Sequence, residues 1–117
     1  MSGWIGVDLD GTLATYEGFI GPGVIGQPIE PMVKRVKNWL REGVDVRIFT
    51  ARVYSQPDNP SGQESAAIAL LAIQKWCFLH LGAILPVTCQ KDYDMYELWD
   101  DRAIQVIKNT GIPVGPR

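Results

Sequence analysis

The sequence of 117 residues predicts an α/β domain of three layers, in which helices cover both faces of a central parallel sheet. Short apolar runs alternate along the chain with stretches of helical periodicity. Clusters of Gly, Pro, Asn and Asp separate these segments, as is typical of turns. The length suits one hydrophobic core, so we expect a single domain over residues 1–117.

The first strand is expected over residues 4–9, a short apolar run that stops at Asp10 and Gly11. Residues 13–30 follow, and Gly and Pro are frequent among their scattered apolar side chains. Such a composition favours a loop or a small hairpin over a long regular element. We expect this segment to form a flap.

The first helix is expected to begin at Pro31, because proline suits the first position of a helix. Apolar residues then recur at helical spacing, and Gly43 is a natural stop. Residues 44–49 alternate in polarity and are rich in β-branched residues, which predicts a second strand that ends at Thr50.

The second helix is expected to begin at a capping box made by Ser61 and Glu64 and to end near His80. Its buried face is predicted from helical spacing to consist of Ile68, Leu71, Ala72, Trp76 and Leu79. Three short strands are expected afterwards, over residues 83–88, 95–99 and 103–107, before a tail rich in Gly and Pro.

The composition argues against a nucleic-acid-binding protein, a cysteine-ligated metal site and a membrane protein. The formal net charge is −2 and no basic stripe occurs, which argues against tight binding to nucleic acid. Cys77 and Cys89 have no metal-ligand spacing to each other or to His80, so we expect two free thiols in a reducing compartment. The sequence shows neither a leader-like start nor an apolar run near 20 residues, and we expect a cytoplasmic protein without membrane partners.

Carboxylates follow several predicted strands at the edge where parallel sheets bind ligands. These residues are Asp8 and Asp10 after the first strand and Asp100 and Asp101 after a later one. Two like charges about 4 Å apart repel by roughly 4 kcal/mol at an effective dielectric constant of about 20. A hard divalent cation removes this penalty, and Mg²⁺ combines carboxylates with a substrate phosphate. The cluster therefore predicts magnesium and a phosphorylated ligand.

Two simpler interpretations compete with this one. An EF-hand calcium loop needs glycine at its sixth position, and counting from Asp8 that position is Leu13. Asp also caps helices and forms turns, which would explain Asp10 before Gly11, or the pair Asp100 and Asp101, but not all four carboxylates together.

The motifs DLDGTLA, IFTAR, a following lysine and WDD resemble the signature of the haloacid dehalogenase superfamily of phosphatases and phosphotransferases. They occur in the same order and extend from Asp8 to Asp101. The resemblance implies a Rossmann-like fold and Mg²⁺-dependent hydrolysis of a phosphomonoester through an aspartyl-phosphate.

The resemblance also implies a role for each matching residue. Asp8 is the expected nucleophile, and Asp10 the expected general acid and base, with its backbone carbonyl on the metal. The Thr50 hydroxyl and the Lys91 ammonium are expected to contact the transferred phosphoryl group. The remaining expected site residues are Asp100 and Asp101 as metal ligands and Gly11, Thr12 and Arg52 as substrate-binding residues.

Many members of this superfamily carry a cap domain that selects the substrate, and this chain has no room for one. Only 17 residues lie between Leu13 and Pro31, whereas a small domain needs about 50. We therefore expect an open site, which a second copy of the chain would close if it forms a homo-oligomer, and a small substrate such as a nucleotide or sugar phosphate. The alternatives are a polynucleotide 3′-phosphate, a phosphoprotein, an acceptor other than water, and a binding domain without turnover.

Overall fold

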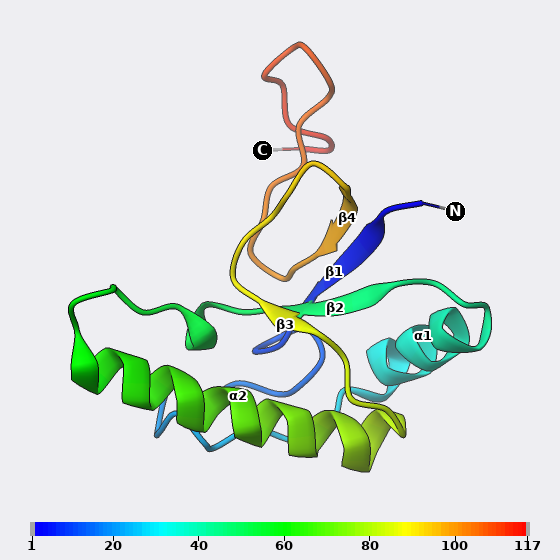
Figure 1. Ribbon diagram of the computed structural model, residues 1–117. Coiled ribbons are helices and arrows are strands. Elements are labelled where there is room, and N and C mark those ends of the chain that lie inside the picture. The colour runs from blue at the N-terminus through cyan, green and yellow to red at the C-terminus, as the bar shows by residue number, and fades with distance from the viewer. Residues whose placement is uncertain (1, 117) are drawn as a thin grey trace.

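The computed structural model describes residues 2–116 and contains a four-stranded sheet in the order β3-β2-β1-β4 (Figure 1). All three pairs of neighbouring strands are parallel. The predicted α/β class with a central parallel sheet is therefore confirmed. In chain order the elements are β1 (Trp4–Asp8), α1 (Glu30–Arg41), β2 (Val46–Phe49), the 3-10 helix η1 (Ala51–Val53), α2 (Pro60–Leu81), β3 (Val87–Thr88) and β4 (Met95–Trp99).

The layering differs from the prediction, because both helices pack against one face of the sheet. Ile5 and Val7 of β1 lie beside Val46 and Ile48 of β2, and these side chains share one core with apolar residues of α1 and α2. The connections from β1 to β2 and from β2 to β3 run in the same direction across the sheet, and crossovers of the usual right hand then place both helices on the same side. Residues 89–94 connect β3 to β4 without a helix, so the described residues hold no third layer.

The opposite face of the sheet is covered by side chains of its own strands and of the loop before β4. Trp4 is almost fully buried there, and its indole N–H donates to Asp92 at 2.8 Å. The Arg47 guanidinium lies over that ring, 4.7 Å from its centroid. This arrangement lets a central strand remain buried without a second helical layer.

Helix α2 begins and packs differently from the prediction. Asn59 caps it, since its Oδ1 accepts the Gly62 N–H at 3.1 Å, whereas Ser61 only donates its hydroxyl to the same oxygen. The buried residues of α2 are Ala69, Ile73, Trp76, Cys77 and Leu81. Of the predicted face, Trp76 is buried and Ile68, Leu71 and Leu79 are exposed. Apolar side chains surround this helix nearly completely, so spacing alone does not identify the packed face.

Of the three later strands that were predicted, β4 is confirmed over Met95–Trp99, and the other two differ from the prediction. Strand β3 comprises only Val87–Thr88, and residues 103–107 form no strand beyond an isolated bridge between Val106 and Pro113. That segment lies outside the sheet, whose order ends at β4. Within the part of the chain that is described, neither helix is both long and apolar enough to cross a membrane.

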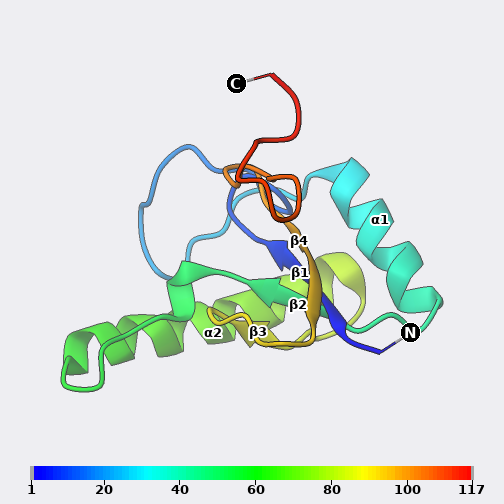
Figure 2. The same ribbon diagram turned by 90° about the horizontal axis from the view of Figure 1, so that it is seen from above.

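The flap predicted over residues 13–30 is a loop up to residue 29, where α1 follows, and it is closed at its base. Thr15 N–H donates to the Gln27 carbonyl at 2.8 Å, and Ile29 N–H donates to the Leu13 carbonyl at 2.8 Å. A Cβ at Gly26 would lie 2.0 Å from the Thr15 carbonyl oxygen, so the two limbs approach as closely as they do only because residue 26 is glycine. Figure 2 shows the flap extending from the end of β1.

Candidate active site

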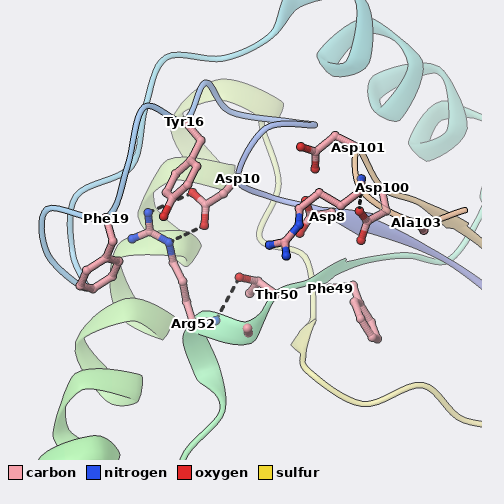
Figure 3. Close-up of a pocket in the computed structure, with 12 residues that line it drawn as sticks. Asp8, Asp10, Tyr16, Phe19, Phe49, Thr50, Arg52, Asp100, Asp101 and Ala103 are labelled. Carbon is pink, nitrogen blue, oxygen red and sulfur yellow. Dashed lines mark hydrogen bonds and ion pairs between the residues drawn. The ribbon is translucent and has the colours of Figure 1, made fainter.

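A cavity of about 640 Å³ lies at the carboxyl edge of the sheet, where ligands bind in parallel α/β folds (Figure 3). Its walls come from the end of β1, the flap, the segment after β2 and the segment after β4. The residues that line it are Asp8, Asp10, Tyr16, Phe19, Phe49, Thr50, Ala51, Arg52, Asp100, Asp101, Arg102 and Ala103. Six of the nine site residues predicted from the sequence belong to this set.

Asp8, Asp100 and Asp101 form an acidic cluster in which one oxygen of each carboxylate lies within 4.8 Å of the others. The Thr12 hydroxyl is 3.4 Å from Asp8 Oδ2 and 3.3 Å from Asp101 Oδ1, so it lies between two of the three carboxylates. Asp100 Oδ1 accepts the backbone N–H of Arg102 at 2.7 Å, which fixes the turn after β4. Thr12 therefore lines the acidic cluster and does not line the cavity wall itself.

Gly11 makes the acidic cluster possible by leaving space for a carboxylate. Its φ of 89° lies in the left-handed region that favours glycine, and a Cβ there would be 2.6 Å from Asp101 Oδ2. Its own N–H donates to the Ala14 carbonyl at 2.8 Å. Gly11 thus shapes the turn and leaves space for Asp101, and its expected role in binding substrate stays a prediction.

The acidic cluster carries unbalanced negative charge. The pKa of Asp8 rises from 3.8 to about 7, first because the carboxyl is partly buried, then because of Asp100, Asp101 and Asp10 nearby. Within residues 2–116 no cation forms an ion pair with any member of the cluster. A site that raises a carboxyl pKa in this way favours either a proton or a cation.

The cluster fits a hard divalent cation in its donor atoms. All three donors are carboxylate oxygens, the ligands that Mg²⁺ prefers. For bonds of about 2.1 Å, the ligands of an octahedral Mg²⁺ lie about 3.0 Å apart when adjacent and about 4.2 Å apart when opposite. The three oxygens lie within 4.8 Å of one another, so they must move closer together to bind one ion.

Asp10 is placed apart from the cluster by a bidentate ion pair with Arg52. Arg52 Nε donates to Asp10 Oδ2 at 2.8 Å, and Nη2 donates to Oδ1 at 2.9 Å. The Arg52 side chain is only 7% exposed, so solvent screens this pair weakly. Arg52 therefore fixes the orientation of Asp10 at the cavity wall.

Arg52 also holds the flap. Its Nη1 donates to the carbonyl oxygens of Gly21 and Pro22, each at 3.2 Å, and its guanidinium lies 5.5 Å from the centroid of the Phe19 ring. These contacts use most of the five N–H groups of the guanidinium. The guanidinium is therefore engaged within the protein, and the expected contact of Arg52 with substrate stays a prediction.

Thr50 is at the cavity wall as predicted, and its side chain is free to donate. The residue is 3% exposed, and its Oγ1 accepts the Arg52 backbone N–H at 3.2 Å. Because that contact uses the oxygen as acceptor, the hydroxyl proton remains available for a ligand oxygen in the cavity.

Lys91 is exposed and does not line the cavity, so the structure does not bring it to the other predicted residues. Arg102 lines the cavity instead, directly after Asp101. The sequence shows this arginine beside the acidic pair, but the resemblance to the superfamily signature implied the lysine instead. Tyr16, Phe19 and Phe49 also line the cavity and were missed, because nothing local distinguishes them from other aromatic residues of a loop or a strand end.

No protein-family model matches the sequence, and no curated protein matches it. Among solved structures, the chain is similar to one described as the conserved protein coded by a locus from Bacteroides thetaiotaomicron. The two share 18% sequence identity with a TM-score of 0.56, over 88% of this chain and 78% of that chain. A likeness at this level of identity supports the α/β fold with its parallel sheet and carries no information on activity.

Proposed function

We propose that this protein is a Mg²⁺-dependent phosphomonoester hydrolase of the haloacid dehalogenase type. The observation that carries the proposal is the composition of one cavity wall: the acidic cluster, the Asp10 carboxylate and the free Thr50 hydroxyl lie around the same space. A carboxylate nucleophile, a second carboxylate for proton transfer and a hydrogen-bond donor are the groups that phosphoryl transfer through an aspartyl-phosphate requires.

Asp8, Asp100 and Asp101 would hold the cation through their carboxylates, and the Asp10 carbonyl would complete the protein ligands. When bound, Mg²⁺ would offset the negative charges that meet as Asp8 approaches a phosphate. Thr50 donates its hydroxyl proton to a phosphoryl oxygen, and the charge that Lys91 was expected to supply falls to Arg102 at the cavity wall.

The reaction has two steps. In the first step an oxygen of Asp8 attacks phosphorus, the bond from phosphorus to the leaving oxygen breaks, and Asp10 gives a proton to that oxygen. In the second step Asp10 takes a proton from water, the water oxygen attacks phosphorus, and the bond between phosphorus and Asp8 breaks to release phosphate. Both Asp10 oxygens accept from Arg52, so one of these two bonds must open during turnover.

A reducing compartment such as the cytoplasm belongs to the same proposal. Both cysteines are free, and burial raises the pKa of the Cys77 thiol to about 11, which keeps it protonated and unreactive.

Release of phosphate from p-nitrophenyl phosphate tests the proposal. We expect turnover with Mg²⁺, loss of turnover with EDTA, and loss in Asp8→Asn and Asp10→Asn. Asp58→Asn is the matched control, because Asp58 is an exposed carboxylate outside the cavity. Full activity in Asp8→Asn, or none in the wild-type protein with any of a panel of phosphomonoesters, would contradict the proposal.

A further inference from the structure

The flap brings two aromatic rings to the cavity, and both remain largely exposed there although the Arg52 guanidinium lies 5.5 Å from the centroid of the Phe19 ring. Tyr16 and Phe19 line the cavity, yet they are 46% and 61% exposed. An apolar ring at a cavity wall gains free energy when a ligand covers it, because apolar surface is then removed from water. Because both rings line the cavity, a ligand that covers them must lie inside it.

These rings lie on the Asp10 side of the cavity. In Figure 3 Tyr16 and Phe19 are beside Asp10 and Arg52, whereas Asp8, Asp100 and Asp101 occupy the other side. The contacts agree, because the guanidinium that lies 5.5 Å from the Phe19 ring centroid is the one bonded to both oxygens of Asp10.

The proposed mechanism decides which part of the substrate meets this side. The phosphoryl group must lie at Asp8, and the leaving oxygen must lie within reach of Asp10, which protonates it. The organic part of the substrate therefore extends from the acidic cluster past Asp10 and toward the two rings. Such rings bind a flat aromatic group of a small phosphoester well, because any nucleobase can stack on an aromatic side chain with a favourable free energy.

We propose that the substrate is a nucleoside monophosphate whose base stacks against Tyr16 and Phe19 of the flap. This inference rests on the proposed function, because the direction from Asp8 to Asp10 comes from that mechanism. The cavity of about 640 Å³ is within the usual size range of sites for ligands as large as a nucleotide. Stacking worth about 1–3 kcal/mol corresponds to an affinity gain of roughly fivefold to 150-fold over the same phosphate without a base.

Binding and turnover are measured separately, so that failure of this inference and failure of the proposed function can be distinguished. Calorimetry with the full chain and Mg²⁺ would use the phosphonate analogues of AMP and of ribose 5-phosphate, whose C–P bonds are not hydrolysed. We expect the AMP analogue to bind at least fivefold more tightly. Phe19→Ala and Tyr16→Ala should each remove most of this preference and leave the ribose analogue unaffected. Tyr93→Ala, which removes a fully exposed ring outside the cavity, is the matched control.

Equal binding of the two analogues would overturn the inference, as would a Phe19→Ala variant that weakens both alike. The phosphonate analogue of phenyl phosphate is a further arm: if it binds as tightly as the AMP analogue, any aromatic ring suffices and the assignment of a nucleoside is wrong. A base preference that depends on Phe19, in a protein that releases no phosphate from any ester, would support the aromatic site and refute the hydrolase.

Discussion

Replacing Asp8 by Asn should make the metal-free protein more stable at pH 8 and leave its stability at pH 4 nearly unchanged. The folded pKa of Asp8 is raised to about 7 from 3.8, so the folded state prefers the protonated carboxyl. The stability that this protonated carboxyl gives to the folded state is fully present below the unfolded pKa and is lost as the pH rises through about 7. Above that pH the folded protein carries a charge that Asn removes.

The size of the effect follows from the shift. The folded and unfolded pKa values of Asp8 differ by about 3, and at about 1.36 kcal/mol for each pKa unit this corresponds to roughly 4 kcal/mol of unfolding free energy. Because the carboxyl is half-buried and still contacts solvent, we expect an effect of about 2 kcal/mol. For a chain of 117 residues this corresponds to a rise in Tm of about 8 °C. The Asn side chain still offers Thr12 an oxygen, so that hydrogen bond is retained.

Thermal unfolding followed by circular dichroism in EDTA, at pH 4 and pH 8, measures this difference. Asp58→Asn, which removes an exposed carboxylate, should change Tm at pH 8 by no more than about 2 °C. Added Mg²⁺ should then stabilise the wild-type protein at pH 8 and leave Asp8→Asn unaffected, because binding to the folded state alone raises stability. A variant that is destabilised equally at both pH values would refute the reasoning, since it would show that no charge penalty exists at Asp8.

Three further outcomes are expected. Asn59→Ala should lower the free energy of unfolding by about 1 kcal/mol in a chemical denaturation, because it removes the cap of α2. Arg52→Gln should reduce kcat on p-nitrophenyl phosphate by roughly tenfold to 100-fold and speed amide exchange in the flap, because Asp10 and the flap both lose their partner; an unchanged exchange rate would show that Arg52 does not hold the flap. Lys91→Ala should change kcat/KM by less than about twofold, whereas Arg102→Ala should lower it by roughly tenfold to 100-fold; the opposite order would restore the lysine to the site.

Much of the fold could be predicted because its signals are local. The run at residues 4–9 has the length and composition of a buried strand, and the structure forms β1 over Trp4–Asp8 and buries all of it except Asp8. Gly82 terminates α2 with a φ of 78°, a conformation that glycine adopts without strain. Pro31 lies in the first turn of α1, as a proline at a helix start requires.

The errors concern features that depend on distant parts of the chain. The packed face of α2 is decided by which apolar side chains meet the sheet, and Ile68 and Leu79 fit a helical stripe as well as Ile73 does. Residues 103–107 contain apolar residues typical of a strand. They do not join the sheet, however, because they do not pair with its edge strand β4. The missing third layer likewise follows from the short connection between β3 and β4, which has no room for a helix.

The four carboxylates that the sequence predicts at one site differ in whether a cation of the protein neutralises them. Asp10 has a cation at 2.8 Å, supplied by Arg52 from the segment after β2, and its charge is balanced without any ligand. Asp8, Asp100 and Asp101 have no such partner within residues 2–116, and the raised pKa of Asp8 reflects that imbalance. The need for an external cation is therefore confined to three of the four, where the proposed mechanism brings a phosphate to Asp8. In that mechanism the proton-transfer carboxylate of Asp10 is paired and the nucleophile Asp8 is unpaired. Cation binding should therefore change the state of the Asp8 carboxylate and leave the Asp10 carboxylate paired with Arg52, which is why metal and pH should act on the stability of this protein through the same residue.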